Sequence, residues 1–123
     1  MLLAALGRPP GSQGAPFRAY VADPHARIYV AELEREVVGV ASLCIRARLN
    51  WATPEGWIPD LFVRPEARRR GVAIALLDVC AETARSLSSH LLRLDCGHDR
   101  TEAHALYERY GFRHAGRDYR LTL

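Results

Sequence analysis

The chain has 123 residues, of which 49% are apolar and 25% are charged, and its formal net charge at pH 7 is +3. These values are ordinary for one soluble globular domain and exclude a disordered or collagen-like chain. All 17 basic residues are arginines, which excludes chemistry that needs a lysine amine, such as a Schiff base.

Cysteine, histidine and apolar patterning indicate a reduced protein without metal. The three cysteines form no CxxC pair, and the five histidines form no pair at ligand spacing. No apolar run reaches the ~20 residues of a membrane helix, and the apolar start at residues 2–6 lacks the basic flank of a signal peptide. We therefore expect a cytoplasmic protein that binds no membrane.

Short helices and a β-hairpin are predicted for the first part of the chain. Residues 2–6 and 15–21 form the helices, each stopped by a following proline. Residues 27–33 and 37–46 are rich in β-branched or aromatic residues and form the hairpin, with its turn at residues 34–36. Gly39 within the second strand indicates a bulge or a close approach of backbone.

A strand, the longest helix and another strand follow. Residues 57–63 are predicted as a strand, with irregular pairing at Pro59, which lacks an N–H. Apolar residues recur every three or four positions from about residue 70 to 88, which predicts a long helix. Residues 91–96 form a short apolar strand.

The last part of the chain is predicted as one helix and two strands. The helix begins near Arg100, with Asp99 as N-cap and Glu102 completing a capping box, and ends at Gly111. Residues 112–115 and 118–123 form the strands. The whole chain, 1–123, is thus one α+β domain in which the first ~25 residues are a short helical part.

The start of the long helix has the features of an anion site. Arg68, Arg69 and Arg70 precede Gly71 and Ala73 at the point where a helix presents unpaired N–H groups and partial positive charge. Guanidinium groups suit phosphate, and glycine lets the backbone approach its oxygens. The absent lysine argues against a nucleoside triphosphate loop.

At this point the chain resembles the Gcn5-related N-acetyltransferases (GNAT). Residues 60–73 resemble the family's strand and phosphate loop, whose signature Arg/Gln-x-x-Gly-x-Gly/Ala is matched by Arg68, Gly71 and Ala73. Residues 103–112 (AHALYERYGF) resemble the family's C-terminal segment, at the spacing that the family uses. The resemblance covers roughly residues 27–123.

The resemblance implies a mixed, mostly antiparallel twisted sheet with flanking helices. In that fold the strands at residues 57–63 and 91–96 run parallel and splay apart to admit acetyl-CoA. The implied function is transfer of an acetyl group from acetyl-CoA to a primary amine of a small molecule or peptide, by direct attack in a ternary complex and without a metal. The alternative is a non-catalytic acetyl-CoA-binding module. A nucleic-acid-binding protein is disfavoured, because a net charge of +3 is small and no aromatic residues interleave with the arginine run.

The resemblance also assigns roles to residues. Tyr107 matches the family tyrosine that donates a hydrogen bond to the leaving thiolate, although a tyrosine packed in the core has the same pattern. His104, one turn away, is expected to be a packed or solvent-facing histidine. The expected cofactor-binding residues are Leu61, Phe62 and Val63 through their backbone, and Arg68, Arg69, Arg70, Gly71, Val72 and Ala73 around the pyrophosphate.

Three groups are candidates for the base that accepts the amine proton. Asp60 on the cofactor strand is the first candidate, Glu55 in the preceding loop is the second, and a water held by backbone carbonyls is the third. Asp60 could instead be a solvated or paired carboxylate at a strand end.

Two departures from the family pattern matter. Arg100 stands where many members carry an asparagine that contacts the cofactor, so we expect Arg100 to reach a phosphate or a substrate carboxylate. The family's first strand is expected to be missing ahead of residue 27, which leaves residues 27–33 as an exposed sheet edge. Pairing with a second copy in a homodimer is one way to cover that edge.

Overall fold

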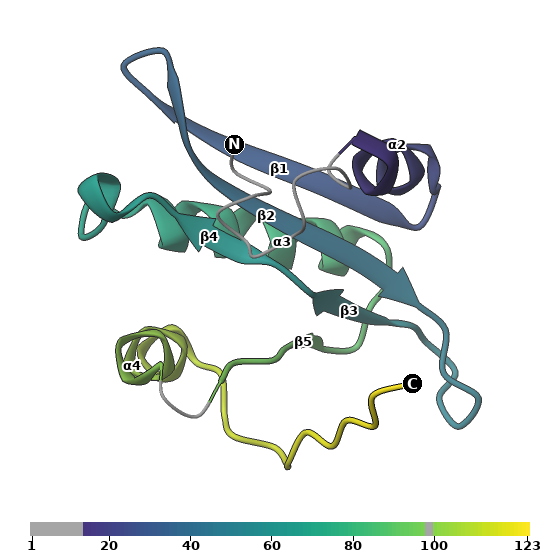
Figure 1. Cartoon of the computed structure of the whole chain (residues 1–123). Helices are drawn as coiled ribbons and strands as arrows, with labels where there is room; N and C mark the ends of the chain where they lie inside the picture. The colour runs from purple at the N-terminus through teal and green to yellow at the C-terminus, as the bar shows by residue number, and fades with distance from the viewer. Residues whose placement is uncertain (1–13, 98–99) are drawn as a thin grey trace.

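The computed structural model describes residues 14–97 and 100–123. The described elements follow one another as helix α2 (Gly14–Ala22), strands β1 (Ala26–Leu33), β2 (Glu36–Arg46), β3 (Glu55–Ile58) and β4 (Leu61–Val63), a 3-10 turn (Pro65–Ala67), helix α3 (Val72–Ser86), strand β5 (Leu92–Leu94) and helix α4 (Thr101–Tyr110). They build one mixed sheet in the order β1-β2-β3-β5, with β4 also pairing β2 (Figure 1). The α+β GNAT-like architecture predicted from the sequence is confirmed.

The predicted hairpin forms β1 and β2, which pair antiparallel. Its turn places Glu34 and Arg35 at φ 51° and 68°, and two consecutive left-handed residues match the right-handed twist of the flanking strands. Ala31 pairs with Gly39 and Glu32 with Val37, so Val38 is an extra, bulged residue beside the glycine. A Cβ added at Gly39 would lie 3.0 Å from Val72 Cγ1 and 3.2 Å from the carbonyl oxygen of Phe62. The glycine therefore has both of the features expected of it, an adjacent bulge and a close backbone approach.

The strand predicted over residues 57–63 is divided in two. Cys44 pairs with Trp57 in β3, but Ala41 pairs with Leu61 in β4, so the register shifts by one residue between them. Pro59 and Asp60 both lie opposite Ser42 as a result. Proline removes one ladder donor here, and the backbone N–H of Ser42 donates to the carbonyl of Asp60 at 2.9 Å to hold the break.

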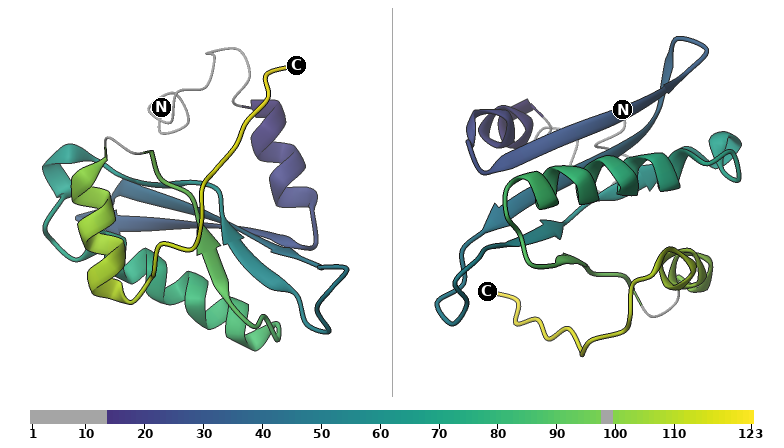
Figure 2. Two further views of the ribbon diagram at one scale, coloured as in Figure 1. Left: turned by 90° about the horizontal axis from the view of Figure 1, so that it is seen from below. Right: turned by 180° about the vertical axis from the view of Figure 1, so that it is seen from behind.

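The core lies between the sheet and α3. Alternation along β2 turns Ala41 and Leu43 toward the helix, where both side chains are fully buried. The other buried core residues are Val38, Ile58, Ala67, Val72, Leu76, Leu77, Cys80 and Tyr107. Helix α2 lies across the opposite face of the sheet from α3 (Figure 2). Helix α4 lies beside α3, and the Tyr110 hydroxyl donates to Asp78 Oδ1 at 2.7 Å between them.

The two final strands predicted from the sequence do not form. Residues 112–123 have no strand geometry, and Tyr119, Leu121 and Leu123 are 82%, 84% and 110% exposed. A strand exists only through pairing, and β5 is three residues long and pairs with β3 alone among the described strands. The segment runs as an extended chain along the lower side of the view in Figure 1, below β5.

The helix ends agree in part with the sequence. Gly111 is the C-cap of α4 with φ 123°, as predicted. Arg100 occupies the N-cap and makes no side-chain capping bond. Asp99, the predicted cap, and the helix predicted over residues 2–6 both lie outside the described residues.

Strand β1 is an edge of the sheet within residues 14–97 and 100–123, as predicted. Val30 on this strand is 56% exposed. Pairing of the edge with a second copy stays a prediction.

The substitution Gly39→Ala tests the close packing of β2 against α3 and β4. The added methyl has to displace Val72, Leu76 or backbone of Phe62, so the free energy of unfolding should fall by about 1–3 kcal/mol. Urea unfolding measures this change. Gly116→Ala is the matched control, because its Cβ meets nothing within 4 Å, and it should change stability by less than about 0.5 kcal/mol. Equal effects of both substitutions would contradict the packing assigned to Gly39.

Candidate active site

The pairing of β3 with β5 ends at the strand break, and we call the region between the unpaired edge of β4 and the chain after β5 the wedge. Strands β3 and β5 run parallel and pair from Gly56–Leu92 to Ile58–Leu94, and there the pairing ends. After Pro59 and Asp60 the chain continues as β4, which pairs with β2 and with no other described strand. The parallel pairing predicted for these two strands is thus confirmed, and their splaying beyond Ile58 and Leu94 stays a prediction.

The free edge of β4 presents backbone groups to this wedge. Ser42 N–H donates to the Asp60 carbonyl and Arg64 N–H donates to the Val38 carbonyl, which makes Phe62 and Val40 a hydrogen-bonded pair. The N–H and C=O of Phe62 are therefore used by β2. Those of Leu61 and Val63 point the other way, into the wedge, and the Val63 carbonyl accepts the Arg68 Nε–H at 3.3 Å.

The loop from Arg68 to Gly71 leads directly into α3. Arg69 has φ 63° and Gly71, the N-cap, has φ 78°, so two left-handed residues within three positions curl the backbone. No side chain caps the helix, which leaves the N–H groups of its first turn without side-chain partners. A Cβ at Gly71 would meet nothing within 4 Å, so the glycine serves the backbone angle and leaves the space in front of the helix open. Arg68, Arg69 and Arg70 are all exposed at this end.

Tyr107 on α4 belongs to the core cluster and is 8% exposed. Its ring packs edge-on against Phe112 with the centroids 6.0 Å apart. Burial raises the pKa of the phenol, the nearby Cys96 adds to the rise, and Arg100 opposes it. The hydroxyl is therefore a neutral donor, with no hydrogen-bond partner among the described side chains and backbone. The structure thus shows the packed tyrosine that the sequence allowed, and its role toward the leaving thiolate stays a prediction.

His104 ties the start of α4 to the end of β5. Its Nε2 lies 2.7 Å from the carbonyl oxygen of Gly97. This is the packed role that the sequence favoured.

Asp60 and Glu55, the two carboxylates considered as bases, have different surroundings. The Ser42 hydroxyl donates to Asp60 Oδ2 at 2.8 Å, and Asp60 is only partly buried at the break. Glu55 is 1% exposed and forms ion pairs with Arg46, Arg48 and Arg93. Burial alone would raise the pKa of Glu55, but hydrogen bonds from Arg46 and Arg48 outweigh it and hold the pKa below its ordinary value.

Tyr20 of α2 lies over the sheet face that carries Ser42 and Asp60. Its hydroxyl is buried without a hydrogen-bond partner in the described part of the chain. Burial, reinforced by the neighbouring Asp60 and Asp23 carboxylates, raises the pKa of Tyr20 to about 12. The tyrosine is therefore neutral, and its hydroxyl lies beside Ser42, whose side chain opposes the rise in pKa.

The residues selected from the sequence lie on three parts of the fold. Leu61 and Val63 line the wedge, residues 68–73 form the loop at its end, and Tyr107 and Arg100 belong to α4, which follows β5. Sequence reasoning missed Tyr20, Ser42 and the three arginines around Glu55. The spacing of Arg46 and Arg48 at a strand end, opposite Glu55 across the β2–β3 connection, was the available signal.

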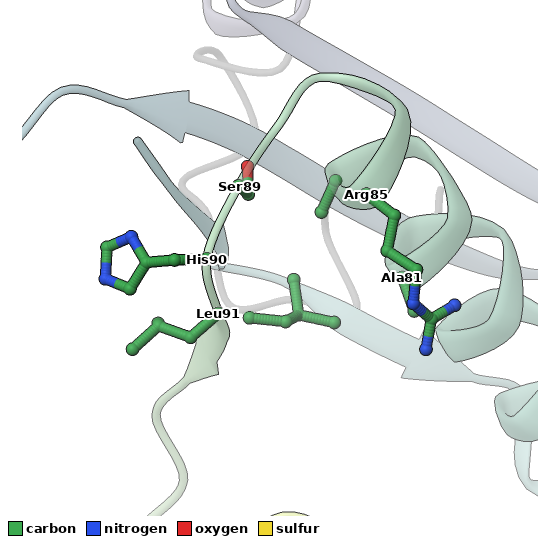
Figure 3. Close-up of a pocket in the computed structure, with 7 residues that line it drawn as sticks. Ala81, Arg85, Ser89, His90 and Leu91 are labelled. Carbon is green, nitrogen blue, oxygen red and sulfur yellow. The ribbon is translucent and has the colours of Figure 1, made fainter. Parts of the chain in front are cut away.

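A hollow of about 230 Å³ lies at the other end of α3, far from Gly71 along the helix. It is lined by Ala81, Arg85, Ser89, His90 and Leu91 among others, and the side chains of Arg85 and His90 lie on opposite sides of it (Figure 3). The Ser89 hydroxyl is buried there without a hydrogen-bond partner in residues 14–97 and 100–123. Because the hollow lies at the C-terminal end of α3, it is a different site from the wedge beside β4.

Metal-ligand clusters and membrane-spanning helices are both absent from residues 14–97 and 100–123. No group of three or more histidine, cysteine, aspartate or glutamate side chains has the arrangement of a metal site. No helix in these ranges is both long and apolar enough to cross a membrane.

Comparison with known proteins identifies relatives. Residues 5–112 match the Acetyltransferase (GNAT) family. The chain is 33% identical over 97 residues to an aminoalkylphosphonate N-acetyltransferase of Salmonella typhimurium, covering 79% of this chain and 63% of that protein's length. The chain thus spans less than two thirds of this relative.

Solved structures share the fold. A transcriptional regulator from Bacillus halodurans matches with a TM-score of 0.87 and 23% identity, over 93% of this chain and 77% of the other. AAC(6')-Iy, an aminoglycoside N-acetyltransferase, in complex with the bisubstrate analogue CoA-S-monomethyl-acetylneamine, matches with a TM-score of 0.84 and 22% identity, over 95% and 83%.

The substitution Glu55→Gln tests the ion cluster. At pH 7 the loss of the buried carboxylate should lower the free energy of unfolding by about 1–3 kcal/mol. A carboxyl whose pKa is lowered by folding stabilises the fold above its unfolded pKa, ordinarily 4.5, and this stabilisation is lost as pH falls through the folded value. The stability gap between wild type and variant should therefore close below pH 4.5.

Urea unfolding at several pH values measures that gap. Glu66→Gln is the control, since Glu66 is 70% exposed and lies 4.0 Å from its arginine partner, and it should have little effect at any pH. A gap that is constant from neutral to acid pH would contradict the role assigned to the Glu55 charge.

Proposed function

The chain belongs to the acetyltransferase (GNAT) family, and on that premise we propose that it transfers the acetyl group of acetyl-CoA to a primary amine, by direct attack of the amine in a ternary complex. The observation that carries the proposal is the wedge beside β4, which leads to the uncapped start of α3 with its three exposed arginines. Acetyl-CoA supplies the activated acyl group, and the chain's own residues bind it, orient it and manage the protons.

The loop before α3 suits the pyrophosphate of coenzyme A. The N–H groups of the first helical turn and the partial positive charge of the helix start favour an anion. Arg68, Arg69 and Arg70 add positive charge, and Gly71 leaves the approach open. Val72 and Ala73 contribute backbone N–H groups of the first turn. Arg100, at the N-cap of α4, supplies a further guanidinium near Tyr107 for a phosphate or a substrate carboxylate.

The edge of β4 suits the pantetheine arm. The backbone groups of Leu61 and Val63 face the wedge, whereas those of Phe62 belong to the pairing with β2. We therefore assign the polarising N–H for the thioester carbonyl to Val63 rather than to Phe62. Phe62 contributes by holding the strand in register.

Tyr107 is proposed to stabilise the leaving thiolate. Because burial raises the pKa of its phenol, the group stays protonated at neutral pH and can donate a hydrogen bond to developing negative charge. Full proton transfer is not needed for this role.

Asp60 is proposed as the group that accepts the amine proton, directly or through a water. It lies at the strand break that opens the wedge, and the Ser42 hydroxyl orients its carboxylate. Glu55 suits this role poorly, because its arginine partners stabilise the charged form and so weaken it as a base.

The acceptor belongs to the primary amines. The relatives include an aminoalkylphosphonate acetyltransferase and an aminoglycoside acetyltransferase, whose acceptors share an amine but differ in charge.

A homodimer is proposed because the β1 edge of the sheet is exposed. A cytoplasmic location is proposed because Cys44, Cys80 and Cys96 are free cysteines.

A thiol-release assay with acetyl-CoA over a panel of amines tests the function. We expect acetyl-CoA to raise the thermal midpoint of unfolding, because it binds the folded chain alone, and at least one amine to release thiol above the hydrolysis background. A thermal shift without release from any amine would instead support the non-catalytic acetyl-CoA-binding module. The absence of both would contradict the proposal.

The substitution Tyr107→Phe tests the role of the phenol. Turnover should fall by roughly 100-fold while the dissociation constant for acetyl-CoA stays within about 2-fold. Tyr110→Phe is the matched control, because it removes a hydroxyl from the same helix that is bonded to Asp78 instead. It should affect stability more than turnover. Unchanged turnover in Tyr107→Phe would remove this residue from the mechanism.

A further inference from the structure

Glu55 lies beneath a cluster of three guanidinium groups. The Arg46 Nε–H donates to Oε1 of Glu55 at 2.8 Å. Arg48 Nη1 lies 3.1 Å from both carboxylate oxygens, and Arg93 Nε lies 3.4 Å from Oε2. We call Arg46, Arg48 and Arg93 the arginine cluster. It joins three segments, because Arg46 ends β2, Arg48 follows it and Arg93 is the central residue of β5.

The arginine cluster carries more positive charge than Glu55 neutralises. Three positive charges face one negative charge, which leaves a surplus of two. The carboxylate is 1% exposed, whereas the arginine side chains are 38%, 39% and 39% exposed. Each guanidinium has several N–H donors, and apart from the bonds to Glu55 these have no acceptor among the described residues. Glu55 therefore fixes the three arginines at its buried carboxylate, while more than a third of each arginine side chain stays exposed.

The cluster lies on the same face of the sheet as the strand break. Paired residues share a face, so Arg46 lies beside Glu55, Cys44 beside Trp57, and Trp57 beside Arg93. The Arg46 guanidinium stacks over the Trp57 ring at 4.5 Å. Trp57 precedes Asp60 by three residues, which is a distance of ~10 Å along an extended chain. Trp57, which contacts Arg46 and pairs with Arg93, therefore lies between the cluster and the strand break along β3.

Acidic groups lie on the wedge side of this surface. The Trp57 indole N–H donates to Asp95 Oδ2 at 3.3 Å, and Asp95 directly follows β5 where the wedge opens. Asp60 lies at the break itself. Along the strands the surface therefore changes from positive at the arginine cluster to negative at Asp95 and Asp60.

We propose that the arginine cluster binds the anionic end of the acceptor, and that the acceptor is an amine carrying a phosphonate or phosphate group. This inference rests on the proposed function and names its substrate class. Such a group carries up to about two negative charges and three acceptor oxygens, which match the surplus charge and the free donors. Its ammonium end then points toward Asp95 and Asp60, at the mouth of the wedge.

The charge pattern selects against other acceptors. A polycationic amine would bring like charge to the cluster and be repelled. A carboxylate is planar and singly charged, so it leaves part of the surplus unpaired. A merely structural cluster would need a single arginine to neutralise Glu55, whereas here three arginines share one carboxylate.

The substitution Arg93→Gln tests the inference, because Arg93 has the longest contact to Glu55 and its loss leaves two arginines on the buried carboxylate. In the wild type, kcat/KM should be at least about 10-fold higher for aminoethylphosphonate than for ethanolamine, an amine of similar size that lacks the anionic group. Arg93→Gln should lower the value for aminoethylphosphonate by roughly 10-fold and that for ethanolamine by less than about 2-fold. Methylphosphonate should compete with the amine and not with acetyl-CoA.

Arg93→Lys keeps the charge and should restore part of the preference, which separates recognition from folding. Arg35→Asn at the hairpin turn is the control for loss of a surface arginine, since asparagine tolerates the φ of 68° there. Equal kcat/KM for aminoethylphosphonate, ethanolamine and neamine, or equal losses for all three in Arg93→Gln, would overturn the inference and leave the proposed function standing. Transfer to no amine would overturn the proposed function itself, and this inference with it.

Discussion

The break between β3 and β4 is the constraint on which the rest of the site depends. A regular strand from residue 55 to 63 would continue to pair with β5 and close the sheet. The extra residue at Pro59–Asp60 shifts the register, and Ser42 holds the break with its backbone N–H on the Asp60 carbonyl and its hydroxyl on the carboxylate. One serine therefore stabilises both the opening of the wedge and the orientation of the proposed base. The unpaired edge of β4 is tolerable because a ligand can satisfy its donors and acceptors.

The sequence predicted correctly those elements that depend on residues close together in the chain. The period of α3, the alternation in β1 and β2, and the positive φ at Gly111 all follow from residues close in the chain. The strands predicted over residues 112–115 and 118–123 were wrong, because alternation supplies a suitable face and a strand also needs a partner with free backbone groups. The three-residue β5 offers little length for such pairing. Pro59 likewise indicated irregular pairing, but only the register of β2 with both neighbours shows that the strand divides.

The loop at residues 68–73, proposed to bind pyrophosphate, could be selected from the sequence because its residues are consecutive. The complete arginine cluster could not be selected in this way. Arg46, Arg48 and Arg93 come from segments on two sides of α3, and only the pairing of β3 with both β2 and β5 brings them to one carboxylate. The same holds for Tyr20, which reaches the break from α2 on the far face of the sheet (Figure 2). The spacing of Arg46 and Arg48 at a strand end was a partial signal, but nothing in the chain links these two residues to Arg93, or Tyr20 to the strand break.

Because the chain has no lysine, both the loop at residues 68–73 and the arginine cluster carry their positive charge on guanidinium groups. A guanidinium is planar and less strongly hydrated than an ammonium, so it can stack on Trp57 and bond a buried carboxylate through one edge while its other edge stays available. An ammonium at Arg46 would lose the stacking and the fixed direction of its donors. Glu55 restricts the rotation of three flexible side chains at once, which lowers the conformational entropy that a bound anion would otherwise have to remove. The buried carboxylate thus preorganises the positively charged surface above it. The free-energy cost of burying Glu55 is offset by the hydrogen bonds from the arginines, which keep it ionised.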